Sequence, residues 1–387
     1  MIHDVLIVGA GPAGASAAVA LGQRGARDVL LLDRSRFPRD KTCGSGLSPN
    51  ALKLADELGI GPELRRLANP VESVKLVTRG GREMTLASNA AAVVLLRRDF
   101  DNLLVERAKA LGVQFQGGVP VSEAIREQGR VVGVRRQDGS ELRARMVLFA
   151  DGSHSIFSVD PRPKVSISTL MGWWEGADFV PGQLEMIFDR NVAPLYGWLF
   201  PETATRVNIG ICVDAPSPDG RQPKRNLRQV FSDFLKDHYQ TRLARSRQVG
   251  KLQGHPIVYT TWIEHCTVPG ALYVGEAARI TNSATGEGIS HAMQSGVYAA
   301  EAVTQVLDGK AEESDAWEEY ERKHRRRFTP EFVGGQALRK AIDSPLLDTL
   351  ASAYNSPFIR RSVIRLLGSA LAGSAVAPAS SPESHSR

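Results

Sequence analysis

The residues with the clearest chemical potential are three glycines near the start of the chain, Gly9, Gly11 and Gly14, and one acid, Asp33. The glycines follow an apolar run, residues 5–8, and precede an alanine-rich stretch typical of a helix. In such a strand–turn–helix unit the glycines permit a tight turn, let the backbone approach a pyrophosphate and let the helix pack closely on the strand. Asp33 ends a second apolar run, where a carboxylate can accept hydrogen bonds from a ribose. The pattern predicts a dinucleotide-binding βαβ unit.

A loop containing a cysteine follows this unit. Residues 34–50 are rich in Pro, Gly and Ser, and they place Cys43 next to Gly44 and close to Gly46. Glycines beside a cysteine allow the backbone to lie close to a flat ligand. The alternative is a structural thiol in a turn, and the residues alone leave both interpretations open.

Two later segments could also contact a ligand through their backbone. The apolar run 146–150 ends at Asp151 and Gly152, and open α/β sheets bind ligands at the carboxyl ends of their strands. Residues 285–289 place glycines at the start of a predicted helix, where free N–H groups face an electron-rich group. Together with the N-terminal glycines, these segments suit a long cofactor with an adenylate at one end and a redox ring at the other.

The elements that would position these residues indicate an α/β protein. Helices are predicted at 50–58, 95–111, 227–238 and 286–300, a hairpin at 72–95, a strand meander at 113–145, and a separate buried strand at 146–150. Short alternating strands between 163 and 262 indicate an antiparallel sheet.

Aromatic side chains are concentrated between residues 173 and 200: Trp173, Trp174, Phe188, Tyr196, Trp198 and Phe200. Tyr196, Trp198 and Phe200 alternate along a predicted strand, so they project to the same face of the sheet. Core packing is one explanation for this face, and the wall of an apolar substrate cavity is the other.

Composition narrows the class of protein. The chain has 387 residues, 42% hydrophobic and 23% charged, with a net charge of +6, as in ordinary soluble globular proteins. Its basic residues are not confined to one tail, and no other feature supports nucleic-acid binding. The three cysteines, Cys43, Cys212 and Cys266, are too far apart for a disulfide framework or a zinc site. We therefore expect no metal, and a reducing, cytoplasmic compartment.

The C-terminal part is predicted to be helical from residue 311. Residues 312–321 are acidic and 322–327 basic, an order that complements a helix dipole and indicates solvated helix ends. Residues 358–367 are basic and apolar at helical spacing, so they could lie on an anionic membrane surface or pack on the body of the protein. Beyond residue 373 the composition predicts disorder.

With these motifs in order, the chain resembles the geranylgeranyl reductase family of flavoproteins, which belongs to the p-hydroxybenzoate-hydroxylase-like FAD enzymes. The resemblance runs from residue 1 to about residue 305. It combines the Gly9–Gly14 turn and Asp33, the Cys-Gly-x-Gly-Leu loop at residues 43–47, Arg97, and the motifs at 275–279 and 286–289. Residues 196–201 match the family's Tyr-x-Trp-x-Phe-Pro substrate-cavity signature.

The resemblance, taken with the element pattern, implies a domain plan. We expect a Rossmann-type FAD-binding domain (1–70, 94–155 and 265–310), an inserted antiparallel-sheet substrate domain (71–93 and 156–264), a C-terminal helical segment (311–372) and a disordered tail (373–387).

The resemblance also assigns expected roles to single residues. The implied FAD-contacting residues are Gly9, Gly11, Ala13, Gly14, Asp33, Arg34, Cys43, Gly44, Gly46, Arg97, Val121, Glu276, Gly288 and Ile289. Tyr196, Trp198 and Phe200 would shape the substrate cavity, and Cys43 is the catalytic candidate, as wall or proton donor. Two positions depart from the pattern, because Glu276 stands where the family usually has Asp and Pro194 lies one residue nearer to Tyr196 than expected.

The implied reaction is reduction of C=C bonds in a prenyl or other apolar substrate by hydride transfer from reduced flavin. The expected partners are that small molecule and an electron donor, either a nicotinamide or a carrier protein, with peripheral membrane contact left open. A flavin-dependent monooxygenase or halogenase is the main alternative. Halogenases of this scaffold carry Trp-x-Trp-x-Ile-Pro, of which only Trp198 and Pro201 are present here. A non-enzymatic flavin-binding module is a third class.

Overall fold

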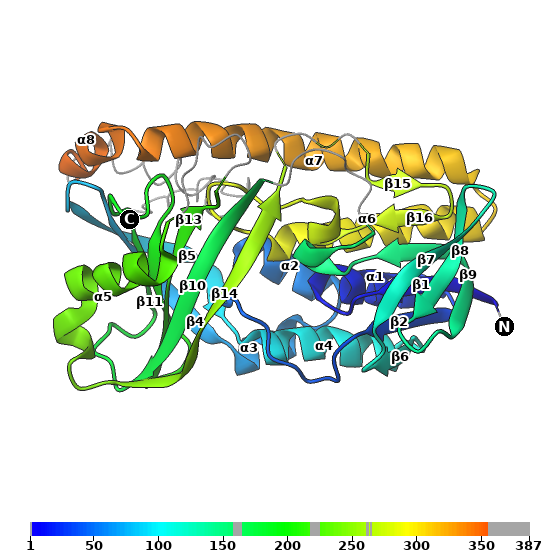
Figure 1. Ribbon diagram of the computed structural model, residues 1–387, viewed down its shortest axis with the longest axis horizontal. Coiled ribbons are helices and arrows are strands. Elements are labelled where there is room, and N and C mark those ends of the chain that lie inside the picture. Colours follow the sequence, from blue (N-terminus) through cyan, green and yellow to red (C-terminus); the bar gives the residue numbers. More distant parts are fainter. Residues whose placement is uncertain (1, 158–164, 217–224, 261–262, 264, 355–387) are drawn as a thin grey trace, which may run out of the picture.

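Two mixed sheets, joined along one side by a long helix, make up the protein. The computed structural model describes residues 2–157, 165–216, 225–260, 263 and 265–354. In Figure 1 the first sheet lies on the side of the N-terminus, the second lies at the opposite end, and helix α7 runs over both. The α/β architecture predicted from the sequence, with its helical C-terminal segment, is confirmed.

The first sheet has the order β15-β16-β9-β1-β2-β6. Its strands are β1 (Ile2–Val8), β2 (Val29–Asp33), β6 (Gln114–Gly117), β9 (Glu141–Phe149), β15 (Thr267–Val268) and β16 (Ala271–Tyr273). Strands β1, β2, β6, β9 and β16 are parallel. The antiparallel hairpin β7 (Val121–Glu127) and β8 (Arg130–Arg136) extends the sheet through β9. Runs of Val, Ile and Leu that are buried on both faces are typical of such strands.

Strand β9 corrects one sequence prediction. Residues 142–145 and 146–150 were expected to form two strands, but residues 141–149 form a single strand. Its first half carries mostly exposed or partly exposed side chains, where it pairs with β8 at the edge, and it is continuously buried from Met146 onward, where it lies between β1 and β16.

Close helix packing on this sheet depends on small residues. Helix α1 (Pro12–Gln23) is buried from Pro12 to Leu21 and lies between α4 (Arg97–Ala110) and α6 (Ile289–Leu307). A β-carbon at Gly296 of α6 would lie 2.2 Å from the carbonyl oxygen of Ala13. Glycine at this position therefore lets α6 approach the start of α1.

The second sheet has the order β14-β10-β13-β12-β11-β4-β5-β3. Its strands are β3 (Gly46–Leu47), β4 (Asn69–Val77), β5 (Glu83–Val94), β10 (Val165–Glu175), β11 (Gln183–Ile187), β12 (Gly197–Pro201), β13 (Arg206–Asp214) and β14 (Arg247–Tyr259). The sheet is antiparallel as predicted, apart from the parallel pair β4–β11. Helix α5 (Leu227–Leu243), five residues longer than the predicted 227–238, packs on one face through Phe231 and Phe234.

The remaining elements connect the two sheets. Helices α2 (Pro49–Glu57) and α3 (Gly61–Leu67) follow the cysteine loop, and short 3₁₀ turns η1 (Gly152–His154) and η2 (Gly275–Ala278) follow β9 and β16. Both turns therefore lie at the carboxyl ends of neighbouring parallel strands, on the same edge of the first sheet as the Gly9–Gly14 turn.

Helix α7 (Glu313–Ile342) is one helix of 30 residues, about 45 Å long at 1.5 Å per residue. The prediction that the basic run 322–327 ends a helix is wrong, because these residues lie in its middle. Arg322, Arg325 and Arg327 there pair with glutamates of α7 itself, each three or four positions away.

Helix α8 (Leu346–Ser352) ends the described part of the chain. The predicted amphipathic segment 358–367 and the tail 373–387 lie outside the described residues. Among the helices in the described ranges, none combines the length and apolar composition needed to cross a bilayer.

Candidate active site

The N-terminal turn has the geometry that a dinucleotide requires. Gly9 has a φ of +104°, and a β-carbon there would lie 2.4 Å from the carbonyl oxygen of Ala150. A β-carbon at Gly14 would lie 1.9 Å from the carbonyl oxygen of Gly9. Both positions therefore need glycine, Gly9 for its backbone conformation and Gly14 for the close approach of helix α1 to the turn.

Gly11 differs from Gly9 and Gly14 because a β-carbon built on it would point into open space. A β-carbon at Gly11 would meet nothing closer than Nη2 of Arg39, at 3.8 Å. Arg39 is largely buried, and its Nη1 has no hydrogen-bond partner in the described structure. An open glycine at a helix start beside an unsatisfied guanidinium fits a pyrophosphate.

Asp33 lies at the end of β2 with its carboxylate facing this turn. Its Oδ2 accepts a hydrogen bond of 2.9 Å from the N–H of Ala10, and Oδ1 accepts one of 2.8 Å from Ser35. Arg39 Nε lies 3.7 Å from Oδ1. The acid therefore also holds the turn together, in addition to its predicted contact with a ribose.

A buried charged cluster links Arg39 to Arg97. Arg97 forms two hydrogen bonds with Asp101, of 2.7 and 2.8 Å, and Arg39 Nη2 lies 3.1 Å from the same carboxylate. Burial disfavours the charge of Arg97, but Asp101 and a hydrogen bond with the Cys43 side chain raise its pKa above the usual value. Arg97 therefore stays charged, and its charge on helix α4 lies close to the cysteine loop.

Lys41 and Glu276 lie near the same loop. Burial, followed by the charge of Arg97, lowers the pKa of Lys41. Burial raises the pKa of Glu276, against the opposing influence of Lys41 and of a 3.2 Å hydrogen bond from the N–H of Val258. Glu276 thus ties η2 to β14 in the second sheet.

The turn after β9 meets β14 as well. Ser153 Oγ lies 2.9 Å from Nε2 of His255, and the rings of His154 and His255 contact each other edge to face. Burial, reinforced by the charge of Lys41, lowers the pKa of His255 to about 3, so this imidazole is neutral near pH 7. Burial raises the pKa of Asp151.

The start of α6 forms a second glycine turn. Gly286 has a φ of +66° and Gly288 is the N-cap of α6. The carboxylate of Glu287 accepts hydrogen bonds from the hydroxyls of Ser48 and Ser290. The Tyr196 hydroxyl donates to the carbonyl of Thr285, so the aromatic strand β12 contacts this turn directly.

The three signature aromatics lie on one face of the second sheet, as the alternation predicted. Tyr196 and Trp198 are 8% and 4% exposed, and each neighbouring pair of rings is 6.2 Å apart. A β-carbon at Gly44 would lie 3.2 Å from the Phe200 ring and 3.3 Å from Trp198 Nε1. The cysteine loop therefore rests on Trp198 and Phe200.

The structure thus brings most of the predicted residues to one place, between the two sheets. Ala13 packs under η2, 2.7 Å from where a β-carbon of Gly275 would lie, and Ile289 begins α6. No hydrogen bond or ion pair in the described structure joins Arg34 or Val121 to the others. Arg34 follows β2 and is exposed. Val121 begins β7 and packs against the hydrophobic core of the first sheet. Their predicted cofactor contacts stay predictions.

Several residues of this place were missed by sequence reasoning. Arg39 and His255 carry no motif of their own, and only their position in the fold brings them here. Lys41 begins the stretch that resembles the family's cysteine loop, but no role was expected for it. Arg39 lies four residues before Cys43 in a loop already singled out, so a basic residue near a predicted pyrophosphate was the available signal.

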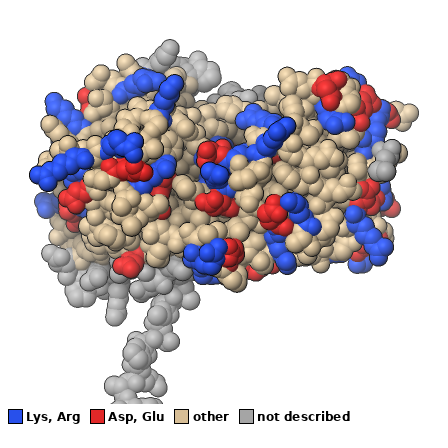
Figure 2. All heavy atoms as spheres, turned by 90° about the horizontal axis from the view of Figure 1, so that it is seen from below, with Lys and Arg blue, Asp and Glu red and all other residues tan. Residues whose placement is uncertain are grey.

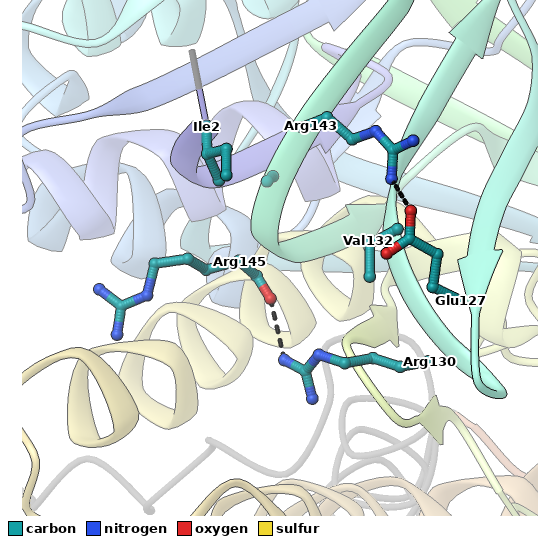
Figure 3. Close-up of a pocket in the computed structure, with 7 residues that line it drawn as sticks. Ile2, Glu127, Arg130, Val132, Arg143 and Arg145 are labelled. Atoms are coloured by element: carbon teal, nitrogen blue, oxygen red, sulfur yellow. Dashed lines mark hydrogen bonds and ion pairs between the residues drawn. The ribbon is translucent and has the colours of Figure 1, made fainter.

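A surface hollow of about 340 Å³ lies elsewhere, at the amino ends of β1 and β9 (Figure 3). Its three arginines are already engaged, Arg143 with Glu127, Arg130 with Glu313 and Arg145 with Asp4. Because open α/β sheets bind ligands at the carboxyl ends of strands, this hollow is not the cofactor site.

Comparison with known proteins gives a consistent result. The family described as FAD binding domain matches residues 3–331. Digeranylgeranylglycerophospholipid reductase of Thermoplasma acidophilum is 28% identical, covering 90% of this chain and 89% of that protein. Digeranylgeranylglycerophospholipid reductase 1 of Methanopyrus kandleri is 31% identical, covering 86% and 87%. Menaquinone reductase of Mycobacterium tuberculosis is 30% identical, covering 77% and 76%.

Solved structures share the fold. A geranylgeranyl bacteriochlorophyll reductase-like protein from Thermoplasma acidophilum superposes with a TM-score of 0.79 at 23% identity, covering 94% of this chain and 96% of that one. A flavin-dependent brominase superposes with a TM-score of 0.78 at 22% identity, covering 95% and 94%. With its glycine turn, its cysteine loop and these relatives, the chain belongs to the FAD-binding flavoproteins of the geranylgeranyl reductase family, and it is an FAD-dependent oxidoreductase.

Proposed function

We propose that this protein reduces a carbon–carbon double bond in a prenyl chain or a comparable apolar chain by hydride transfer from reduced FAD. The observation that carries the proposal is an apolar face of the second sheet that meets the cysteine loop at Trp198 and Phe200. The names of the relatives, reductases of geranylgeranyl lipids and of menaquinone, support the substrate class.

The apolar face extends well beyond the three aromatics. Across the sheet, Trp198 lies in one row with Met186, Leu76 and Met84. Its members cluster with residues of α7 and α8, among them Ile342 and Leu347. Unbranched Met side chains adapt to irregular apolar shapes. Such a face suits a long hydrocarbon chain better than a compact polar substrate.

The chain's own residues fit the cofactor that this chemistry needs. The Gly9–Gly14 turn with Arg39 would hold the pyrophosphate, and the N-terminus of α6, whose N-cap Gly288 makes no side-chain capping hydrogen bond, would face an electron-rich ring. Reduced FAD would supply the hydride. The residues' further task is to exclude water and hold the alkene close to the ring, since an isolated alkene is a poor hydride acceptor.

A proton must follow the hydride to complete the reduction. Cys43 is half-buried, and its side chain interacts electrostatically with both Arg97 and Lys41. We assign Cys43 to this place as wall or proton donor, and Lys41 as a buried cation beside it whose pKa is lowered by burial. The electron donor in this proposal is a nicotinamide or a carrier protein.

An anaerobic titration tests the proposal. The flavin is reduced chemically, a geranylgeranyl lipid or menaquinone is added, and flavin absorbance is followed. We expect reoxidation with stoichiometric saturation of one double bond, and no reoxidation with the fully saturated chain. Oxygen consumption that tracks substrate turnover, without alkene reduction, would instead identify a monooxygenase or halogenase, which share this fold.

A further inference from the structure

A fully buried polar side chain lies among the aromatic residues beside the cysteine loop. Asn208 of β13 is fully buried, at 0% exposure, and lies directly between Phe200 of β12 and Trp173 of β10. Burying an amide costs free energy unless its hydrogen bonds are made. Its presence here therefore calls for an explanation.

Both polar atoms of the Asn208 amide are hydrogen-bonded, one of them to the indole of Trp198. Its Oδ1 accepts a 2.7 Å hydrogen bond from Nε1 of Trp198, and its Nδ2 donates to the carbonyl of Gly172 at 3.3 Å. Because the amide is tied to the backbone of β10, the acceptor for the indole N–H has one position. The hydrogen bond thus fixes the rotation of the Trp198 side chain.

The neighbouring strand is shaped to receive this indole. Gly210 lies opposite Trp198 in the sheet, and a β-carbon there would lie 2.2 Å from Cζ2 of the indole. Any larger residue would push the ring off β13. Asn208 and Gly210 together therefore hold the indole flat against the sheet, one by a hydrogen bond and the other by leaving space.

The cysteine loop contacts the same indole at its Nε1 edge. The α-carbon of Gly44 approaches Trp198 Nε1 and the Phe200 ring so closely that an added β-carbon would be 3.2–3.3 Å from both. From the side of the first sheet, the charge of Arg97 on α4 lies near the Cys43 side chain, which contributes to the raised pKa of Arg97. The cysteine loop therefore lies between a charged group on α4 and an aromatic support on the second sheet.

We propose that Asn208 is a positioning residue, which sets the place of Cys43 by fixing the Trp198 indole on which the cysteine loop rests. Without the hydrogen bond the indole can move away from β13. The cysteine loop then loses its contact with Trp198, while Arg97 stays next to it. Cys43 then becomes more accessible. The consequence for turnover rests on the proposed function, but the consequence for Cys43 does not.

The test measures alkylation of Cys43 by iodoacetamide, read by peptide mass spectrometry, in the FAD-loaded protein. The other two thiols are internal controls, because Cys212 and Cys266 are buried and burial raises the pKa of both. We expect Asn208→Leu to label Cys43 at least about threefold faster, since labelling follows access and thiolate fraction. We also expect an equal gain for Trp198→Phe and no further gain in the double variant, because the two residues act through one contact.

Unchanged Cys43 labelling in a folded Asn208→Leu variant overturns the proposal, and so do additive effects of the two substitutions. If Asn208→Leu does not fold, Gly210→Ala carries the same test, since its methyl group displaces the indole without touching the amide. On a prenyl lipid, we expect kcat to fall with KM little changed. If no prenyl lipid is turned over at all, the proposed function fails while the labelling result still decides the role of Asn208.

Discussion

At the scale of single residues, the site divides into positions where a side chain would meet protein and positions where it would meet ligand. Gly9 and Gly14 belong to the first kind, because an added β-carbon would collide with backbone atoms of the protein itself. Gly11 belongs to the second kind, since its open side faces only the guanidinium of Arg39. Substitutions at the two kinds of glycine should therefore fail in different ways.

We expect Gly11→Val to lose FAD while keeping the fold. Its branched side chain would occupy space that the pyrophosphate needs, but it meets no atom of the protein within van der Waals contact at its β-carbon except Arg39. The measurement is flavin content together with the melting temperature. Gly334→Val on α7, also in open space, is the control and should keep its flavin. Full flavin occupancy in Gly11→Val would contradict the assignment.

Asp33 should contribute both to the stability of the Gly9–Gly14 turn and to FAD binding. Asp33→Ala removes the acceptor for the N–H groups of Ala10 and Ser35, so we expect weaker FAD binding and a loss of stability of about 1–3 kcal/mol. Asp33→Asn keeps an oxygen for one of these donors and should recover most of the stability but not the FAD affinity. Urea unfolding and an FAD titration separate the two effects. Equal FAD affinity in all three proteins would remove Asp33 from the site.

At the scale of elements, helix α7 is fastened to the first turn of α6 by a buried ion pair. His291 Nε2 lies 2.6 Å from Glu331, and its Nδ1 lies 3.0 Å from the carbonyl of Glu287. Burial opposes its charge, but the hydrogen bond with Glu331 and the carboxylate of Glu287 raise the pKa of His291 above 6.5. Arg327 is the other charge facing Glu331.

This pair predicts a pH dependence of stability. Because the pKa of His291 is higher in the folded protein, its stabilisation is complete below 6.5 and is lost as pH rises through the folded value. The unfolding free energy of the wild type minus that of His291→Gln should therefore decrease from pH 6.5 upward. Urea unfolding at a series of pH values checks this. A difference that is constant with pH would show that folding does not shift the pKa of His291, and one that increases with pH would show that the imidazole is neutral in the fold.

Short-range patterns predicted the elements of the site well, and long-range contacts are where sequence reasoning failed. The glycine turn, the cysteine loop and the alternating aromatics of β12 are local, so spacing alone indicated them. Arg39, His255 and Asn208 acquire their roles only through partners on other elements, 62 positions away in the ion pair of Arg39 with Asp101. The basic run in α7 was misread because its glutamate partners make it stable in mid-helix.

At the scale of the whole molecule, α7 joins the two sheets (Figure 1). Near its start, Glu313 pairs with Arg130 beside the first sheet. Near its end, Arg339 pairs with Asp214 of β13 and donates to the carbonyl of Ser283, in the turn before α6. On the opposite face, seen from below in Figure 2, basic and acidic side chains are interspersed.

We expect Arg339→Ala to destabilise the protein by about 3 kcal/mol and to weaken FAD binding. Arg339 and Asp214 are each 11% exposed, so the substitution leaves a nearly buried carboxylate without its partner and releases the turn before α6. The control on the same helix is Arg322→Ala, whose exposed pair with Glu319 should contribute almost nothing. Urea unfolding and FAD titration check both, and equal effects of the two substitutions would contradict the bridging role of α7.

The order of strands in the first sheet has a consequence for when the protein can fold during its synthesis. Strand β1 pairs with β9, and β9 in turn pairs with β16, so neighbours in the sheet are separated by long stretches of chain that build the second sheet. Closing such distant pairs is slow, and their unpaired edges are prone to aggregate in the meantime. During synthesis the first sheet, to which the Gly9–Gly14 turn belongs, is complete only once β16, which ends at Tyr273, has been made. We therefore expect FAD to bind only after the chain has been made at least to this strand.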